Sequence, residues 1–452
     1  MRRLILIGAS LWWFLAGRVS AGGLDYSPIQ HIIIIYQENW SFDGLFGKFP
    51  GADGLDQASA AVSQVDLQGK PLASMPQPWL DPKKKVLDDR FPATLPVGPY
   101  DLTQYVPVTA TTGDMHHRFY QEQVQIDGGK MDKFVAASNN GGLVMSCVDA
   151  TQMPEGKLAA QYTLCDHFFH GAFGGSLLNH ILFVAMAPAI FPNAPATIQA
   201  QPGPDGMPLP GKDGAVSPDG YVINDLEPAS LPHKPDVPSE NLVPPQTMPT
   251  IGDLLSEKKV SWAWFSEGWD DALAGHPDKH FTFHHQAFVY FKNYAEGTEA
   301  RKEHLKDEKD LVAILNGQGD LPQVCFVKFI GSNNEHPHDS ALMQGQRHSV
   351  GLVKKILASR YGKDCVILIT YDENGGRWDH VAPPAGDRWG PGTRVPLIVI
   401  SPFAKKGFVD HTTYTTASIL KFIETRFGLT ALNDRDGKAV NLDNAFDLSP
   451  AP

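Results

Sequence analysis

The sequence predicts an α/β fold, a three-layer sandwich built on a mostly parallel central sheet. Apolar runs of strand length recur along the chain, and each run is continuous rather than alternating, which is typical of strands buried on both faces. A helical pattern between two of the runs supports the parallel arrangement, because parallel strands need a crossover connection. The runs, rich in β-branched residues, are His31–Tyr36, Val324–Phe329, Val366–Tyr371 and Leu397–Ile400.

Two helices are expected in addition to these strands. Residues Ser349–Arg360 carry apolar side chains at helical spacing between the second and third runs, so we expect a right-handed strand–helix–strand unit there. Residues Thr416–Phe427 repeat the pattern after the last run, and Gly428 suits the C-terminal end of that helix.

The two ends of the chain are expected to lie outside the catalytic domain. Residues 1–21 combine a basic start, an apolar stretch too short to span a membrane, and a small-residue cleavage site, so they are interpreted as a signal peptide. We therefore expect a protein that is secreted or periplasmic, with no transmembrane segment in the mature chain. Residues 431–452 are expected to form a C-terminal tail.

Residues 22–430 are predicted to form a single catalytic domain with an insertion at about 188–250, rich in proline and glycine. Residues 201–250 hold 12 of the 36 prolines, which excludes a regular helix there. A domain linker would have the same composition. We favour an insertion that shapes one side of a cleft, because the strand-like runs before and after it read as parts of one sheet.

The net charge narrows the possible binding partners of the protein, and the positions of the cysteines indicate which of them could form a disulfide. A net charge of −12 argues against nucleic acid, which requires a basic stripe, and Lys83–Lys85 is interpreted as a solvated loop. Cys325 and Cys365 lie in apolar runs and are expected to be buried thiols. A disulfide is more expected between Cys147 and Cys165, because export permits one.

Acidic and amide side chains follow two of the predicted strands. Glu38 and Asn39 come directly after the first run, and Asp372 and Glu373 after the third. Since parallel strands deliver their carboxyl ends to one edge of a sheet, these oxygens are expected to converge on a cation. Oxygen ligands suit Ca²⁺, Mg²⁺ or Mn²⁺, and Zn²⁺ stays open. The alternative, that the acids cap helices or pair with lysine and arginine, is less favoured because the pattern occurs twice.

A serine stands at the start of another apolar helical run. Gly174 and Gly175 precede Ser176, and a helix start favours an anion, so Ser176 is placed to meet phosphate. The alternative is an ordinary N-cap serine. The segment lacks the closing glycine of the G-x-S-x-G nucleophile elbow, which disfavours a serine esterase.

Histidines occur in pairs beside aromatic or acidic residues. Any one of them alone is more readily explained as a surface or core residue. Fixed in pairs, imidazoles can bind phosphate oxygens or protonate a leaving group. The pairs are His116 with His117, His284 with His285, and His336 with His338.

Together these motifs resemble the secreted phosphoesterase family that contains bacterial phospholipase C enzymes and acid phosphatases, relatives of the alkaline phosphatase superfamily. The resemblance spans most of the mature chain and implies an alkaline-phosphatase-like fold. Several blocks in the same order are a more specific signal than one motif. The blocks are ENWSFD (38–43), GGKMDKFV (128–135), SLLNH (176–180), EHP (335–337), YDENGGRWDHVAPP (371–384) and GPGTRVPLIVISPF (390–403).

The resemblance implies a metal held by Glu38, Asn39, Asp372 and Glu373, with Ser176 as the nucleophile. No second ligand set of two histidines and one aspartate is visible, so we expect one divalent metal ion.

The nucleophile motif of the family is T-x-P-N-R-like, and Asn179 matches its asparagine. Leu178 and His180 stand where proline and arginine are usual. The same two replacements exclude a sulfatase, which needs C/S-x-P-x-R around its nucleophile.

Further roles follow from the resemblance. We expect His117 and His284, together with Asn179, to contact the substrate phosphate, and His285 or His336 to protonate the departing alcohol. Asp379 and His380 are expected to orient the metal ligands from behind, without touching the ion.

The implied chemistry is double displacement at phosphorus through a phosphoseryl intermediate. The chain lacks the C-terminal β-domains of longer phospholipase relatives, which favours an acid-phosphatase-like phosphomonoesterase acting on small phosphate esters. The alternative is a phospholipase C that cleaves phosphodiesters, with phospholipid head groups as substrates. A non-catalytic secreted binding protein is the third reading.

Overall fold

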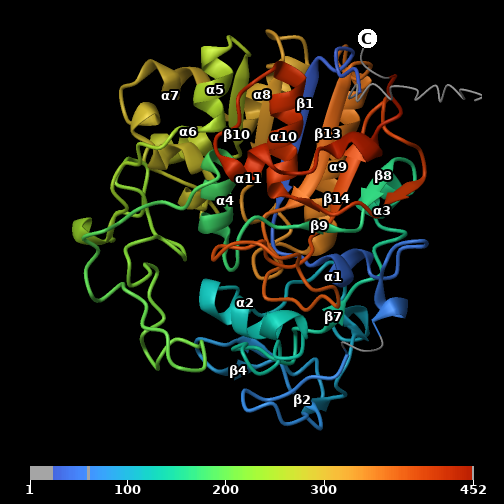
Figure 1. Ribbon diagram of the computed structural model, residues 1–452, viewed down its shortest axis with the longest axis vertical. Helices are drawn as coiled ribbons and strands as arrows, with labels where there is room; N and C mark the ends of the chain where they lie inside the picture. The colour runs from blue at the N-terminus through green and yellow to red at the C-terminus, as the bar shows by residue number, and fades with distance from the viewer. Residues whose placement is uncertain (1–23, 59–61, 450–452) are drawn as a thin grey trace, which may run out of the picture.

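The structure is a computed structural model that describes residues 24–58 and 62–449. The signal peptide expected at residues 1–21 lies outside the described residues. Figure 1 shows the central sheet and its helices in the upper part of the molecule, with irregular segments and short strands below them. In the described residues, no helix has both the length and the apolar character needed to cross a membrane.

The central sheet confirms the predicted α/β class. Its strand order is β11-β10-β12-β1-β13-β14-β8-β15, and within the described sheet only β14 runs antiparallel to its neighbours. The strands are β1 (His31–Gln37), β8 (Thr163–Cys165), β10 (Trp262–Ser266), β11 (Leu305–Asp307), β12 (Val324–Lys328), β13 (Cys365–Tyr371), β14 (Leu397–Ile400) and β15 (Phe408–Asp410).

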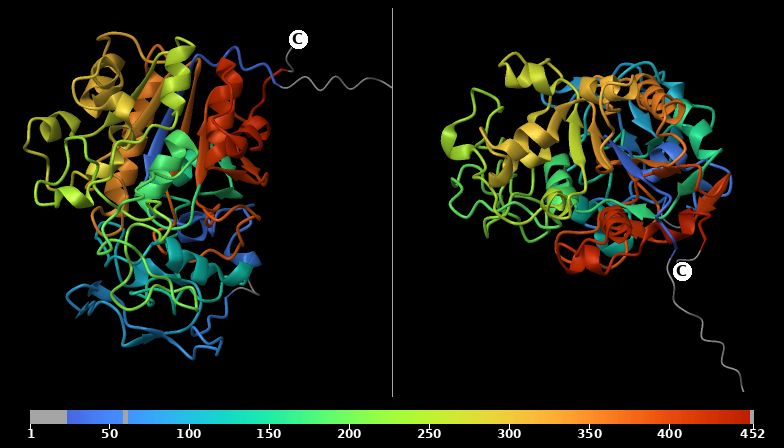
Figure 2. Two further views of the ribbon diagram at one scale, coloured as in Figure 1. Left: turned by 60° about the vertical axis from the view of Figure 1, so that its left-hand side comes forward. Right: turned by 90° about the horizontal axis from the view of Figure 1, so that it is seen from above.

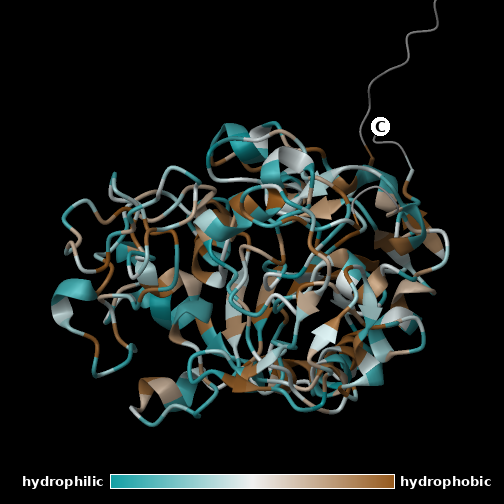
Figure 3. Ribbon diagram, turned by 90° about the horizontal axis from the view of Figure 1, so that it is seen from below, coloured by the Kyte–Doolittle hydropathy of each residue, from teal (hydrophilic) through white to brown (hydrophobic). Residues whose placement is uncertain are grey.

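Helices cover both faces of this sheet. Helices α4 and α10 pack together on one face, and α3 and α9 pack together on the other, as the turned view in Figure 2 shows. In Figure 3 the strands are predominantly brown, whereas the surrounding loops are predominantly teal. The helices are α1 (Phe42–Phe46), α2 (Phe119–Ile126), α3 (Pro154–Ala159), α4 (Ser176–Ala185), α5 (Ile251–Glu257), α6 (Trp269–Leu273), α7 (Glu299–His304), α8 (Glu308–Leu315), α9 (Leu342–Ala358), α10 (Thr416–Phe427) and α11 (Asp434–Gly437).

The predicted strand–helix–strand unit consists of β12, α9 and β13, with β1 inserted between the two strands. Helix α9 starts seven residues before the predicted Ser349. Helix α10 has the predicted bounds, and Gly428 ends it in the left-handed conformation with φ 63°.

Short two-stranded sheets lie outside the central sheet. They pair β2 (Met75–Pro76) with β5 (Thr94–Leu95), β3 (Trp79–Asp81) with β4 (Val86–Leu87), β6 (Tyr100–Asp101) with β7 (Ser146–Cys147), and β9 (Phe168–Phe169) with β16 (Tyr414–Thr415). Figure 1 places β2, β4, β7 and α2 below the sheet edge at which β1 and β13 end.

The assignment of about 188–250 as an insertion and of 431–452 as a tail stays a prediction. Most of 188–250 is irregular, with one short 3₁₀ turn at Ser239–Asn241. Beyond residue 430 the chain folds back on the domain, because Leu442, Ala445 and Phe446 are buried in the same core as the sheet.

The disulfide expectation is wrong in this structure. All four cysteines lie in the described part of the chain, and all are buried and unbridged. Cys147 is in β7 and its thiol donates to the carbonyl of Tyr100, whereas Cys165 is in β8 of the central sheet.

Candidate active site

The two acidic strand ends lie side by side. Strands β1 and β13 pair in parallel with Gln37 opposite Tyr371, so the residues that follow, Glu38 and Asp372, leave the sheet as neighbours. The backbone N–H of Asp372 donates to the carbonyl of Gln37 at 3.1 Å, which extends this pairing by one step. Both carboxylates are buried.

Glycine lets the two ligand segments approach each other. Asn39 adopts the left-handed conformation with φ 68°, which non-glycine residues rarely do outside turns and functional sites. Gly375, with φ 64°, packs against it so closely that a Cβ at this position would lie 2.5 Å from the carbonyl oxygen of Asn39. The glycine therefore sets how near the segment of Asp372 and Glu373 comes to that of Glu38.

A second close approach fixes the candidate nucleophile. Gly174, with φ 86°, packs against the backbone of Phe119, where a Cβ would lie 2.3 Å from the nitrogen. Gly175 occupies the N-cap of α4, and the helix has no side-chain cap, so Ser176 stands at the first helical position and its hydroxyl does not cap the helix. The alternative that Ser176 is an N-cap residue is therefore wrong.

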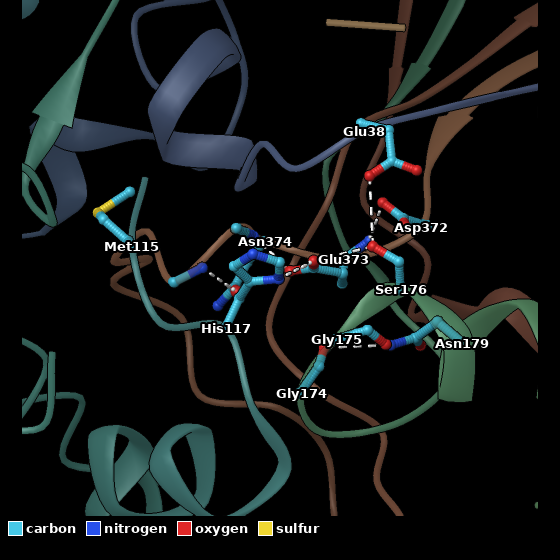
Figure 4. A network of polar contacts seen from close by, with 12 residues as sticks. Glu38, Met115, His117, Gly174, Gly175, Ser176, Asn179, Asp372, Glu373 and Asn374 are labelled. Carbon is cyan, nitrogen blue, oxygen red and sulfur yellow. Dashed lines mark hydrogen bonds and ion pairs between the residues drawn. The ribbon is translucent and has the colours of Figure 1, made fainter. Parts of the chain in front are cut away.

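The hydroxyl of Ser176 faces the acidic strand ends, as Figure 4 shows. Its Oγ lies 3.3 Å from Oε2 of Glu38 and 3.5 Å from Oε1 of Glu373. Three segments that are far apart in sequence thus meet at one oxygen atom. Either carboxylate can accept the hydroxyl proton.

Asn179 holds the turn before the serine. Its side-chain oxygen accepts from the N–H of Ala172 at 2.9 Å, and its amide donates to the carbonyls of Ala172 and Gly175, each at 3.1 Å. These contacts use the amide for the backbone of the turn, as Figure 4 shows for Gly175. In this geometry the polar atoms of Asn179 face the turn, and the phosphate contact expected from the sequence stays a prediction.

Glu38 has cationic and imidazole partners that the sequence analysis did not identify. Lys328, at the end of β12, forms a fully buried ion pair with Glu38. Nε2 of His285 lies 2.9 Å from Oε1 of Glu38, and its ring stacks on that of His180 with centroids 5.1 Å apart. Burial alone would raise the pKa of Glu38, but Lys328 and then His285 hold this pKa well below its usual range.

The residues present fit a divalent cation. Both side-chain polar atoms of Asn39 and Oδ2 of Asp372 are buried without a hydrogen-bond partner among the described residues, and such atoms are rare unless a ligand takes them up. Burial, and then the charge of Glu38, raise the pKa of Asp372 well above its usual range. A cation would relieve this repulsion. A second ligand set that includes Glu38 adds His180 and His285, with ligand atoms within 4.8 Å of one another.

Two of the predicted histidines, His117 and His336, lie next to each other, and His117 contacts Glu373. Nδ1 of His117 lies 2.6 Å from Oε1 of Glu373, and its Nε2 lies 3.7 Å from Asp114. The ring of His336 is 5.9 Å from that of His117. Burial alone would lower the pKa of His117, but Glu373 and Asp114 raise it well above its usual value.

A cavity of about 300 Å³ opens beside His117, and most of the residues that line it are polar or charged by type. Asp225, which the sequence analysis missed, lines it and accepts from the N–H of Leu177 at 3.1 Å in the first turn of α4. Nε2 of His284 lies 3.8 Å from Oδ1 of Asp225. His284 therefore reaches the cavity wall through Asp225.

Asp379 and His380 belong to a different cluster, which corrects the expectation that they orient the metal ligands. Nδ1 of His380 lies 2.7 Å from Asp43, and Asp379 accepts from Nε of Arg394 at 2.8 Å. In the described chain their polar contacts include none to the four candidate ligands. The chain leaves the site after Gly376, because Arg377 stacks on the ring of Trp40 at 3.8 Å and leads the following residues toward α1.

The comparisons identify relatives over most of the chain. Residues 29–430 match the model of the phosphoesterase family. A non-hemolytic phospholipase C of Burkholderia pseudomallei is 26% identical, covering 90% of this chain and 55% of the relative. Phospholipase C A of Mycobacterium tuberculosis is 24% identical, covering 94% of this chain and 78% of the relative. This chain thus spans little more than half the length of the Burkholderia relative.

Solved structures are more distant. A protein of the alkaline phosphatase superfamily from Vibrio parahaemolyticus aligns with a TM-score of 0.36 and 11% identity, covering 87% of this chain and 78% of the other. The family match over residues 29–430 carries the assignment, and the chain belongs to the phosphoesterase family.

Proposed function

We propose that this protein is a metal-dependent phosphoric ester hydrolase in which Ser176 is the nucleophile. The observation that carries the proposal is the position of Ser176 Oγ, 3.3 Å from Glu38 and 3.5 Å from Glu373, at the start of a helix with no side-chain cap. A hydroxyl between two carboxylates has an acceptor for its proton, and a helix N-terminus favours the phosphate that it would attack.

The first step forms a bond between Ser176 Oγ and phosphorus and breaks the bond from phosphorus to the alcohol oxygen. The serine proton passes to a neighbouring carboxylate, and the departing alcohol takes a proton from an imidazole. Water then attacks the phosphoserine, which releases phosphate or a phosphate monoester and restores the hydroxyl.

The cation would be held by Glu38, Asn39, Asp372 and Glu373. Bound there, it would supply positive charge to the serine oxygen and to the phosphate oxygens. Lys328 adds a permanent positive charge on the far side of Glu38. This ammonium supports a single metal ion, because it compensates charge that a second ion would otherwise have to balance.

His336 is the better candidate for the group that protonates the leaving alcohol. His285 is buried against Glu38, and burial lowers its pKa to about 3, so it is neutral near pH 7. His336 is part-exposed, and its ring centroid lies 5.9 Å from that of His117, which lines the cavity. His117 and His284 are then the imidazoles left to contact phosphate.

The relatives favour a phosphodiester substrate. The curated relatives described above are phospholipases C, and they align over 90% or more of this chain. This supports the phospholipase C alternative over the phosphomonoesterase that we expected from the sequence. A non-catalytic binding protein is less consistent with a free serine hydroxyl in contact with two buried carboxylates.

Two substrates distinguish a phosphodiesterase from a phosphomonoesterase. We expect hydrolysis of p-nitrophenylphosphorylcholine, a diester, to exceed that of p-nitrophenyl phosphate, a monoester. Ser176→Ala should lower kcat by about three orders of magnitude or more while the far-UV spectrum is unchanged. Ser239→Ala, in a short 3₁₀ turn of the irregular segment, is the control and should retain activity. Near-normal turnover by Ser176→Ala would remove the serine from the mechanism, and exclusive cleavage of the monoester would restore the phosphomonoesterase reading.

Export is part of the same proposal. The segment 1–21 has the composition of a signal peptide, and the first residue of the exported protein should be Gly22. N-terminal sequencing of protein recovered from the periplasm or the medium measures this directly, and an intact N-terminus there would contradict the predicted cleavage.

A further inference from the structure

A hairpin beside the active-site cavity exposes an unusual set of aliphatic side chains. Strands β3 and β4 form this hairpin, Trp79–Leu87, with an irregular register between them. Leu80, Val86 and Leu87 are 43%, 45% and 42% exposed, and they are three of the eight strongly exposed large hydrophobic residues in the described chain. Single exposed apolar residues are ordinary, but a group of three within nine residues indicates an interaction surface.

Three consecutive lysines form the turn of the same hairpin. Lys83, Lys84 and Lys85 are all exposed, and the side chain of Lys84 is 80% exposed. The protein as a whole carries a net charge of −12, so this positive cluster is contrary to the general character of the chain. Aliphatic side chains next to lysines match an interface that is apolar inside and anionic at its surface.

Hydrogen bonds order the hairpin, both within its turn and at its base. Oδ1 of Asp81 accepts from the N–H groups of Lys83 and Lys84 at 3.1 and 3.0 Å, which fixes the turn. At the base, the side chain of Asn140 accepts from the N–H of Trp79 at 2.8 Å and donates to its carbonyl at 2.9 Å. The exposed side chains are therefore presented by an ordered element.

The position of the hairpin relates it to the site. Asp81, Pro82 and Lys83 line the same cavity as His117 and Gly175, so one side of the turn forms part of its mouth. Figure 1 places β4 at the lower end of the molecule, below α2, whereas α5 and α7 lie at the opposite end. A surface that bound this hairpin would lie against the opening of the cavity.

We propose that the Trp79–Leu87 hairpin docks on an anionic phospholipid surface and sets the cavity mouth against it. The lysines select the negative surface, and Leu80, Val86 and Leu87 enter its apolar boundary. A soluble polyanion would match the lysines but would leave the aliphatic residues exposed, so the membrane is favoured. The inference deepens the proposed function, on which it rests for the lipid nature of the substrate, but the binding itself requires no hydrolysis.

Co-sedimentation with vesicles tests the proposal. The probe is phosphatidylcholine vesicles, pure or with phosphatidylglycerol at roughly 7:3, and the protein is the exported chain from Gly22 carrying Ser176→Ala, so that the lipid stays intact. We expect at least about tenfold stronger partitioning onto the anionic vesicles. Lys84→Gln with Lys85→Gln should remove most of this gain, and Val86→Ser with Leu87→Ser should lower binding by about tenfold.

Matched controls come from the opposite end of the molecule. Lys258 and Lys259 are adjacent and exposed after α5, and Lys259 has φ 57° where Lys85 has φ 56°. Their double change to glutamine should alter binding by less than about twofold. Leu273→Ser with Val440→Ser, at residues 49% and 52% exposed, serves the same purpose for the apolar pair.

The proposal is overturned if neutral and anionic vesicles bind equally, if the controls reduce binding as much as the hairpin variants do, or if the Val86–Leu87 variant binds normally. In that last case binding to heparin would assign the lysines to a soluble polyanion. Hydrolysis of a soluble ester by the hairpin variants in an otherwise unchanged chain should equal that of the parent. Vesicle binding without any ester hydrolysis would refute the proposed function and leave the docking surface standing.

Discussion

Lys328 and Glu38 form a buried ion pair between neighbouring strands at the carboxyl edge of the central sheet. Lys328 is the last residue of β12 and Glu38 directly follows β1, and neither side chain is more than 1% exposed. The ammonium also lies 5.1 Å from the ring centroid of Tyr36. A positive charge is thus built into the place where carboxylates gather, and the site depends on it.

Lys328→Met should therefore damage both stability and activity. It would leave Glu38 buried without its main cationic partner, and we expect a loss of about 3 kcal/mol in the free energy of unfolding, with kcat lowered at least about 100-fold. Urea unfolding and steady-state kinetics measure the two effects. Lys406→Met is the control, because Lys406 lies over the ring of Tyr162 at 4.0 Å and forms no ion pair with a carboxylate of residues 24–58 or 62–449. Equal effects of the two changes would show that Lys328 acts only by packing.

Asp372→Asn should release the cation from a folded protein. The change keeps the shape of the side chain but removes the charge from an oxygen that has no hydrogen-bond partner in the part of the chain that the structure describes. We expect elemental analysis to find about one divalent ion in the parent protein and close to none in the variant. Asp89→Asn, at an exposed position, should retain the ion. Full retention by Asp372→Asn would place the ion elsewhere, for which His180 and His285 with Glu38 are the alternative ligands.

Asn179→Ala distinguishes a residue that shapes the turn from one that binds phosphate. Its side chain makes hydrogen bonds with the backbone of Ala172 and Gly175. Removing them should lower the free energy of unfolding by about 2 kcal/mol and reduce kcat through misplacement of Ser176. Thermal unfolding and kinetics check this. A large increase in KM with unchanged stability would instead support the phosphate contact expected from the sequence.

Glu424 should make stability fall as the pH rises. Burial, and then the neighbouring Asp436, raise its pKa to about 9 in the folded protein. The folded state therefore binds a proton that the unfolded state releases above about pH 4.5, so stability is lost between that pH and about 9. Glu424→Gln should be more stable than the parent by about 2 kcal/mol at pH 8 and equal to it near pH 4. Glu257→Gln, at an exposed site, should show no such dependence, and a pH-independent gain at Glu424 would contradict the raised pKa.

The parts of the fold that depend on local sequence patterns could be predicted. The four isoleucines of β1 and the apolar run of β13 indicated buried parallel strands. The start of α9 was not predictable, because its first turns contain Gly345 and polar residues. Gly345 is required by tertiary packing, since a Cβ there would lie 2.3 Å from the side chain of Glu335. No sequence pattern reports that contact.

The acidic residues of the site could be predicted from the sequence, but the residues around them could be predicted only in part. Glu38 and Asp372 could be placed together because they follow strands of one parallel sheet. Lys328 could not, because a lysine at the end of a strand usually faces solvent, and its burial depends on Glu38 from another strand. Asp379 and His380 were misplaced for a related reason, since proximity in sequence to Asp372 does not show that the chain turns away after Gly376.

The pairing of β1 has a consequence for how the protein is made. Ile32 pairs with Val324 and Val366, so the first strand to leave the ribosome has no partner until roughly 290 more residues have been synthesised. At about 5–20 residues per second, that interval lasts from roughly 15 seconds to a minute. Throughout it, a run of consecutive isoleucines is open to wrong pairing, so we expect the nascent chain to be prone to aggregation at high rates of expression.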